Sequence, residues 1–124
     1  MIDQVSVPKK REGFWLWFLK LLSGLLVIVL LFVHLIVNHL TASEGLLTFN
    51  EVVAYFSNPW IVAMELSFLV IVVTHALIGA RSVILDLNPS DGTLRAVDIF
   101  FVLLGLASIG YGIWLTSVIV GYNA

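Results

Sequence analysis

The feature that most constrains this chain is the length of its uncharged stretches. Residues 21–43 and 99–124 contain no formally charged side chain, and residues 66–80 form a shorter uncharged core. Each stretch, with its apolar flanks, can supply the roughly 20 residues that a helix needs to cross about 30 Å of hydrocarbon. The composition agrees, because 60% of the residues are hydrophobic and only 11% are charged, whereas soluble domains carry far more charge. The sequence therefore predicts an all-α integral membrane fold.

Three transmembrane helices are predicted within a single domain that covers residues 1–124, at about 14–40, 59–86 and 96–120. A proline in the first turn of a helix costs no hydrogen bond, so Asn58-Pro59-Trp60 favours the start of the second helix. Residues 46–57 mix apolar and polar side chains and suggest a short interfacial helix. Residues 88–92, Asn-Pro-Ser-Asp-Gly, indicate a turn.

The basic residues are distributed asymmetrically along the chain. All six flank the start of the first helix or the connection between the second and third: Lys9, Lys10, Arg11, Lys20, Arg81 and Arg95. Residues 41–58, which join the first two helices, contain none. By the positive-inside rule the N-terminus and the second connection face the cytoplasm, or the matrix of an organelle, and the first connection and the C-terminus face outward. We therefore expect a multi-pass protein of the inner, cytoplasmic membrane.

The chain has three histidines, and all lie in or at the ends of the apolar segments: His34, His39 and His75. A histidine inside a bilayer is costly to keep without a partner, so each marks a candidate functional site. Haem iron is the partner that we expect. The chain has no cysteine, so a cysteine-ligated iron–sulfur cluster would have to lie in a partner subunit.

The two histidines inside the predicted spans lie at different depths. His34 is about six residues from the outer end of its helix and His75 about fifteen from the outer end of the next, a difference of roughly 14 Å at 1.5 Å per residue. The axial ligands of one haem must approach its iron from opposite faces at nearly the same depth. The two histidines therefore serve two centres, or only one of them is a ligand. In both cases another chain must supply the opposite ligand.

The helix face around His75 is a candidate cofactor surface. Gly79, Ser82 and Asp86 fall on the same stripe of a helical wheel, which runs from mid-membrane to the cytoplasmic surface. Gly79 leaves room for a flat macrocycle. The serine and the carboxylate lie where a polar head group could enter.

The cytoplasmic end of the first helix supplies further candidates. Ser23 shares the His34 face, and Gly24 lies at about the depth of His75. An inner haem could therefore lean against this helix while an outer haem is held by His34. Arg81 points elsewhere on the second helix but could reach a haem propionate by snorkelling.

Other readings of these residues stay open. Each intramembrane histidine could instead hydrogen-bond a neighbouring helix. His39 lies at the interface, where we interpret it as a solvated or propionate-contacting residue rather than an axial ligand. Glu65 lies inside the second helix and needs a partner or a water-filled cavity. At the level of the whole chain, one alternative is a haem-free structural or accessory subunit of a larger membrane complex. A self-contained dihaem cytochrome b would need four ligands at paired depths, which three histidines do not supply.

A known family shares several of these motifs. Ser23-Gly24 is followed by His34, then by Asn58-Pro59-Trp60, and then by the run His-Ala-Leu-Ile-Gly-Ala-Arg-Ser-Val-Ile-Leu-Asp over residues 75–86. This pattern resembles the small membrane-anchor subunits of succinate:quinone oxidoreductases (respiratory complex II) and fumarate reductases. The nearest resemblance is to the form with two anchor subunits and two b haems, and it covers roughly residues 14–87.

The resemblance implies roles for the histidines and their neighbours. His75 would ligate the iron of an inner haem b and His34 that of an outer haem b, each completed by a histidine of the second anchor subunit. Gly79 and Gly24 would make room for the macrocycle, and Arg81 would contact a propionate or the quinone.

The resemblance also implies a quinone site at the cytoplasmic end. Asp86 would line it together with Ser23 and Ser82, beside the docked iron–sulfur subunit. Succinate would be oxidised, or fumarate reduced, in the flavoprotein subunit, and electrons would exchange with a membrane quinone near this chain.

The implied protein is a haem-b-binding membrane anchor of succinate dehydrogenase, one part of a multi-subunit helical bundle. Its partners would be the second anchor, the iron–sulfur subunit, the flavoprotein subunit, membrane lipid and quinone, with no nucleic acid. FAD and the clusters would be held only by partner subunits. The chain itself would bind no dicarboxylate and would catalyse nothing in isolation.

Overall fold

The computed structural model describes residues 11–42 and 45–124. These residues form four helices and no strand: α1 (Phe14–Thr41), α2 (Phe49–Tyr55), α3 (Pro59–Asp86) and α4 (Asp91–Gly121). The helices α1, α3 and α4 are each long and apolar enough to cross a membrane. The predicted all-α membrane fold is confirmed. The short helix α2 lies within residues 46–57, the segment for which the sequence suggested a short interfacial helix.

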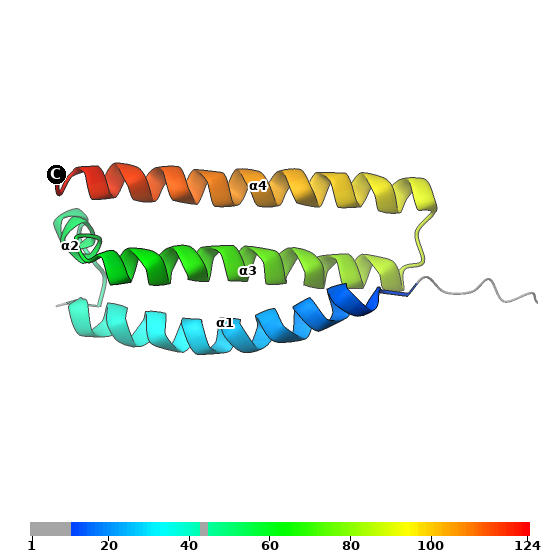
Figure 1. Ribbon diagram of the computed structural model, residues 1–124, viewed down its shortest axis with the longest axis horizontal. Helices are drawn as coiled ribbons and strands as arrows, with labels where there is room; N and C mark the ends of the chain where they lie inside the picture. Colours follow the sequence, from blue (N-terminus) through cyan, green and yellow to red (C-terminus); the bar gives the residue numbers. More distant parts are fainter. Residues whose placement is uncertain (1–10, 43–44) are drawn as a thin grey trace, which may run out of the picture.

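The three long helices lie side by side, with α3 between α1 and α4 (Figure 1). Successive long helices run in opposite directions. The short helix α2 lies at the end where α1 stops and α3 begins, and it also contacts α4. Because α3 lies between α1 and α4, most contacts of α1 and α4 with another long helix are contacts with α3.

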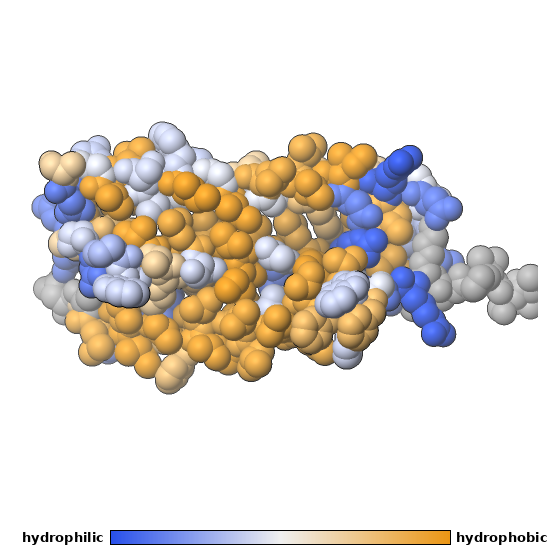
Figure 2. All heavy atoms as spheres, viewed as in Figure 1, coloured by the Kyte–Doolittle hydropathy of each residue, from blue (hydrophilic) through white to orange (hydrophobic). Residues whose placement is uncertain are grey.

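The two ends of the bundle differ in charge. One end of the bundle is where α3 joins α4, and we call it the basic end; the opposite one is the α2 end (Figure 1). By the helix bounds, four basic residues lie toward the basic end: Arg11, Lys20, Arg81 and Arg95. Lys9 and Lys10 lie outside the described residues. Figure 2 shows hydrophobic side chains over the middle of one face and hydrophilic ones gathered at both ends. This distribution is typical of helices that span a bilayer.

Side-chain caps define where α3 and α4 begin. The Asn58 side chain accepts a hydrogen bond from the Trp60 amide at 3.0 Å, with Pro59 in the first turn. The Ser90 hydroxyl accepts from the Thr93 amide at 3.2 Å. Because this cap satisfies an amide that a helix start leaves unpaired, α4 begins at Asp91 rather than near residue 96. The predicted turn over residues 88–92 is therefore too long.

Glycines bring α4 close to α3. A Cβ atom on Gly105 would lie 2.9 Å from Leu77 Cδ1, and one on Gly112 would overlap the side chain of Leu69. Gly110 faces no such neighbour within 4 Å. Small residues at helix contacts are typical of membrane bundles, where close backbone approach replaces a hydrophobic driving force.

The described chain has almost no enclosed core. Among its described residues, Tyr55 and Leu85 are the only buried large apolar side chains. Apolar side chains are exposed along α1 and α4, among them Ile28 and Leu106. In a membrane protein this surface is covered by lipid or by other helices.

Candidate functional site

His75 of α3 is held against α1. Its Nδ1 atom lies 3.0 Å from the hydroxyl oxygen of Ser23, which is buried between the two helices. The Ser23 hydroxyl also lies 3.1 Å from the Lys20 carbonyl oxygen, to which it donates. Within the described part of the chain, the other ring nitrogen, Nε2, has no hydrogen-bond partner. The structure thus brings His75 and Ser23 together. The role of Ser23 at a quinone site, which the resemblance implied, stays a prediction.

Two glycines frame the His75 ring. A Cβ atom on Gly24 would lie 3.1 Å from His75 Cε1, so the absence of a side chain on α1 lets the ring lie against that helix. The sequence analysis placed Gly24 at this depth, and the contact agrees. Gly79, one turn after His75, has no described atom within 4 Å of where its Cβ would be. This opening beside the histidine can receive a group from outside the chain.

A second polar cluster surrounds His34 toward the α2 end. His34 Nδ1 lies 2.8 and 2.9 Å from the two carboxylate oxygens of Glu65, which is 14% exposed. Tyr55 of α2 donates a short hydrogen bond to the same carboxylate. The Asn38 side-chain amide donates to the His34 carbonyl oxygen at 2.8 Å and lies 3.4 Å from Glu65 Oε1. We call these four residues the His34 cluster.

The His34 cluster shows which residues are the partners of Glu65, and it contains two residues that the sequence analysis did not name, Asn38 and Tyr55. Glu65 has its partners inside the chain rather than in an aqueous cavity. Asn38 could have been found from its position one helical turn after His34. Tyr55 carried no sequence signal, because only the fold of α2 over the end of α3 brings it to Glu65. Its burial and its hydrogen bond to Glu65 raise the pKa of the Tyr55 hydroxyl.

The two histidines lie at different levels of the bundle. His75 lies beside Ser23, and residues 23 and 34 of α1 are about 16 Å apart at 1.5 Å per residue. The structure therefore keeps His75 and His34 at separate depths, as the sequence analysis argued. His39, in the last turn of α1, is exposed.

At the basic end, the Ser82 side chain of α3 forms hydrogen bonds with two residues near the start of α1. Its hydroxyl donates to Glu12 at 2.7 Å and accepts from Lys20 at 2.8 Å. Lys20 and Glu12 form an ion pair at 2.7 Å. Burial raises the pKa of the Glu12 carboxyl, but the hydrogen bonds from Lys20 and Ser82 and the positive charges of Lys20 and Arg81 outweigh it, so the pKa lies below its ordinary value.

Arg81 points to the other side of α3. Its guanidinium lies 2.7 and 3.3 Å from the two carboxylate oxygens of Asp98 in α4. The structure therefore does not bring Arg81 together with His75, and Asp98 is a partner that the sequence analysis did not name. Asp86, in the last turn of α3, is exposed at the same end.

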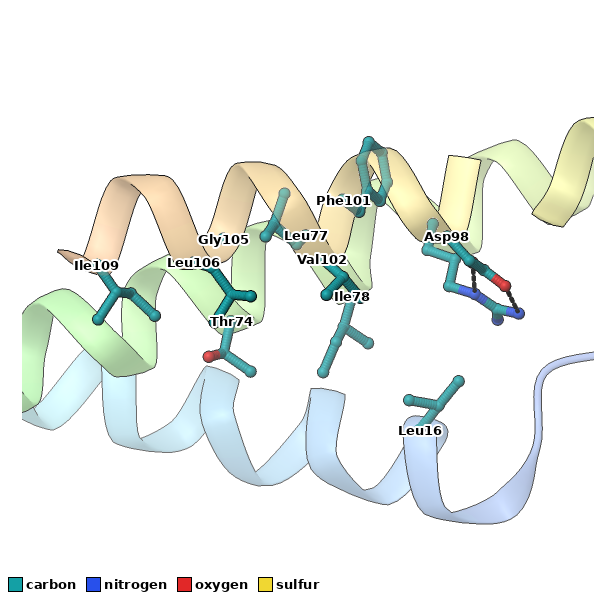
Figure 3. A pocket seen from close by; sticks show the side chains of 11 residues that line it. Leu16, Thr74, Leu77, Ile78, Asp98, Phe101, Val102, Gly105, Leu106 and Ile109 are labelled. Atoms are coloured by element: carbon teal, nitrogen blue, oxygen red, sulfur yellow. Dashed lines mark hydrogen bonds and ion pairs between the residues drawn. The ribbon is translucent and has the colours of Figure 1, made fainter. Parts of the chain in front are cut away.

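An apolar groove lies between α3, α4 and the start of α1 (Figure 3). Its volume is about 450 Å³, and it is lined mainly by apolar side chains such as Leu16, Ile78 and Leu106. The Arg81–Asp98 pair lies at its basic end. A groove of this shape and polarity accommodates an apolar chain.

The sequence has counterparts among known proteins. Residues 3–119 match the family described as "Succinate dehydrogenase/Fumarate reductase transmembrane subunit". The chain belongs to this family. A "Succinate dehydrogenase hydrophobic membrane anchor subunit" of Archaeoglobus fulgidus is 32% identical over 115 residues, which cover 93% of this chain and 97% of that protein. A protein of the same name from Thermoplasma acidophilum is 28% identical over 107 residues, 86% of this chain and 87% of that protein. No solved structure matches the chain.

Membership of the transmembrane subunit family agrees with the three spanning helices. It makes the chain a multi-pass membrane protein that belongs with catalytic partner subunits. The exposed apolar faces of α1 and α4 agree with a membrane protein whose surface is covered by lipid or by other helices.

Proposed function

We propose that this chain is a haem-b-binding membrane anchor subunit of a succinate:quinone oxidoreductase. One observation carries the proposal. The Nδ1 atom of each intramembrane histidine forms a hydrogen bond within the chain, while no described residue forms a hydrogen bond with its Nε2 atom. A polar nitrogen without a partner is costly in a bilayer, where water cannot satisfy it. The names of the two relatives support the anchor role.

The residues present fit haem. Metal-ligating histidines usually donate the other ring N–H to an oxygen acceptor, and Ser23 and Glu65 provide such acceptors for His75 and His34. Space beside Gly79 would admit the edge of a macrocycle near His75. Since the two histidines lie at different depths, a second anchor subunit would supply a further ligand for each.

The basic end would face the cytoplasm in this assignment, because cytoplasmic segments of membrane proteins are enriched in Lys and Arg. The iron–sulfur and flavoprotein subunits, which would hold the clusters and FAD, would dock there. The protein would then lie in the inner, cytoplasmic membrane.

The chain's own residues would act by binding, placement and exclusion of water. Bound haem accepts and releases single electrons. His75 and His34 would hold it, and the surrounding apolar side chains would keep it dry. At the basic end, Asp86 and Ser82 would help to orient a quinone, which takes up two electrons from succinate oxidation in the partner subunits and two protons to become a quinol. Arg81 could reach the same region only by leaving Asp98.

A haem-free structural anchor is the second candidate. It is favoured by the bonds that His75 and His34 make to neighbouring helices, since such bonds alone would justify a histidine in each helix.

A dithionite-reduced minus oxidised spectrum of the purified native complex, with pyridine haemochrome quantitation, tests the proposal. We expect two b haems per complex, one lost in His75→Ala and the other in His34→Ala. His39→Ala, which changes an exposed histidine of the same helix as His34, is the matched control and should retain both. A complex without haem in the wild type would establish the structural anchor instead.

A further inference from the structure

We propose that Ser23 and Glu65 are positioning residues that hold His75 and His34 with Nε2 as the ligand atom, and that Glu65 makes His34 the more electron-donating ligand of the two. The inference rests on the proposed haem function.

The single hydroxyl proton of Ser23 fixes the tautomer of His75. A serine hydroxyl has one proton, and Ser23 donates it to the Lys20 carbonyl oxygen at 3.1 Å. Its oxygen can then only accept at the 3.0 Å contact with His75 Nδ1. This assigns the imidazole proton to Nδ1, which leaves the Nε2 lone pair available to a metal.

Glu65 imposes the same state on His34 through a carboxylate. Glu65 accepts from the Tyr55 hydroxyl and the Asn38 amide. We therefore assign Glu65 as the acceptor and His34 Nδ1 as the donor of their 2.8 Å contact. The ring of Phe68 lies beside the imidazole, with 5.0 Å between the ring centres. The Tyr55 hydroxyl and the Asn38 amide hold the carboxylate from its other sides. His34 is therefore fixed in position as well as in proton state.

The two acceptors differ in strength. A carboxylate draws the Nδ1 proton more strongly than a neutral hydroxyl, which makes the imidazole a better electron donor to iron. Hydrogen bonding around the ligands is one of the levers by which a protein sets a haem potential. The haem bound by His34 should then have a lower midpoint potential from this effect than it would with a neutral acceptor in place of Glu65.

Redox titration of the purified complex tests the inference, with each haem first identified by its loss in His75→Ala or His34→Ala. Glu65→Gln should raise the midpoint potential of the His34 haem and leave the other unchanged. Tyr55→Phe should shift the same haem in the opposite direction, because the carboxylate loses a competing donor and pulls harder on the His34 proton. Damage to the fold does not predict opposite signs from two neighbouring substitutions.

Ser23→Ala should shift only the His75 haem. Ser67→Ala is the matched control: its hydroxyl donates to the Ala63 carbonyl oxygen of its own helix at 2.7 Å and touches neither histidine, so both potentials should stay unchanged. Retention of both haems with unaltered potentials in Glu65→Gln and Tyr55→Phe would overturn the inference and leave the proposed function standing. A wild-type complex without haem would overturn both.

Discussion

The guanidinium of Arg81 lies 2.7 Å from the carboxylate of Asp98 and ties the basic end of α3 to α4. Asp98 is 41% exposed, so the pair is partly open to its surroundings. We expect a double-mutant cycle with Arg81→Gln and Asp98→Asn to give a coupling energy of about 1 kcal/mol or less, measured by thermal unfolding of the complex. A coupling of several kcal/mol would mean that a partner subunit buries the pair.

The close approach of α4 to α3 predicts unequal effects of three glycine substitutions. Gly112→Ala should destabilise the complex by about 1–3 kcal/mol, because its Cβ would overlap Leu69. Gly105→Ala should cost less, since only the end of the Leu77 side chain must move. Gly110→Ala is the control and should have little effect if that face meets lipid. Melting temperatures of the three variants in one detergent provide the comparison; equal losses would contradict the packing.

Substitution of Gly24 should act on the histidine rather than on the helix. In Gly24→Ala the new Cβ would press on the His75 ring at 3.1 Å and weaken its bond to Ser23. We expect a lower haem content with α-helical content unchanged, measured by pyridine haemochrome and circular dichroism. Normal haem content in this variant would mean that the ring adjusts without loss of ligation.

The carboxyl of Glu12 predicts a pH dependence at the start of α1. Because the folded-state pKa is lowered, the stabilisation by Glu12 is fully present above its ordinary pKa of 4.5 and is lost as the pH falls through the lower folded value. Hydrogen exchange of residues 11–20 should therefore be slower in the wild type than in Glu12→Gln at neutral pH, and the two should converge in acid. Lys20→Met removes the same ion pair, so the amide hydrogens of residues 11–20 should also exchange faster in this variant than in the wild type at neutral pH. A difference that persists in strong acid would refute the assignment.

Asp86 provides a direct test of the quinone assignment. Asp86→Asn should reduce succinate-dependent quinone reduction severalfold while haem content stays at the wild-type level, because the residue lies at the basic end, away from the Nε2 atoms of both histidines. Oxidation of succinate with a soluble dye that bypasses quinone should be unaffected. If quinone reduction is unchanged as well, Asp86 has no part in the site.

Part of the candidate site could be predicted from the positions of residues along the sequence. The depths of His34 and His75 follow from counting residues along helices whose rise is fixed, and the contacts with Ser23 and Gly24 agree with that count. The pairing of Glu65 with His34 could not be read in this way. Two residues on different helices meet only when the rotation and the neighbour of each helix are set, and neither is encoded by a local spacing.

The sequence by itself determined the class of the protein, the three spans and the charge of each end. These properties follow from runs of apolar residues and from the positions of Lys and Arg, because insertion into a bilayer depends on the order of residues along the chain and not on tertiary contacts. Only the tertiary structure decided which polar groups meet: Ser23 with His75, Glu65 with His34 and Tyr55, and Arg81 with Asp98. The reason is physical, since helices that are apolar on most sides carry little periodic signal for the face that turns inward. Close packing at residues such as Gly105 and Gly112 sets that rotation instead.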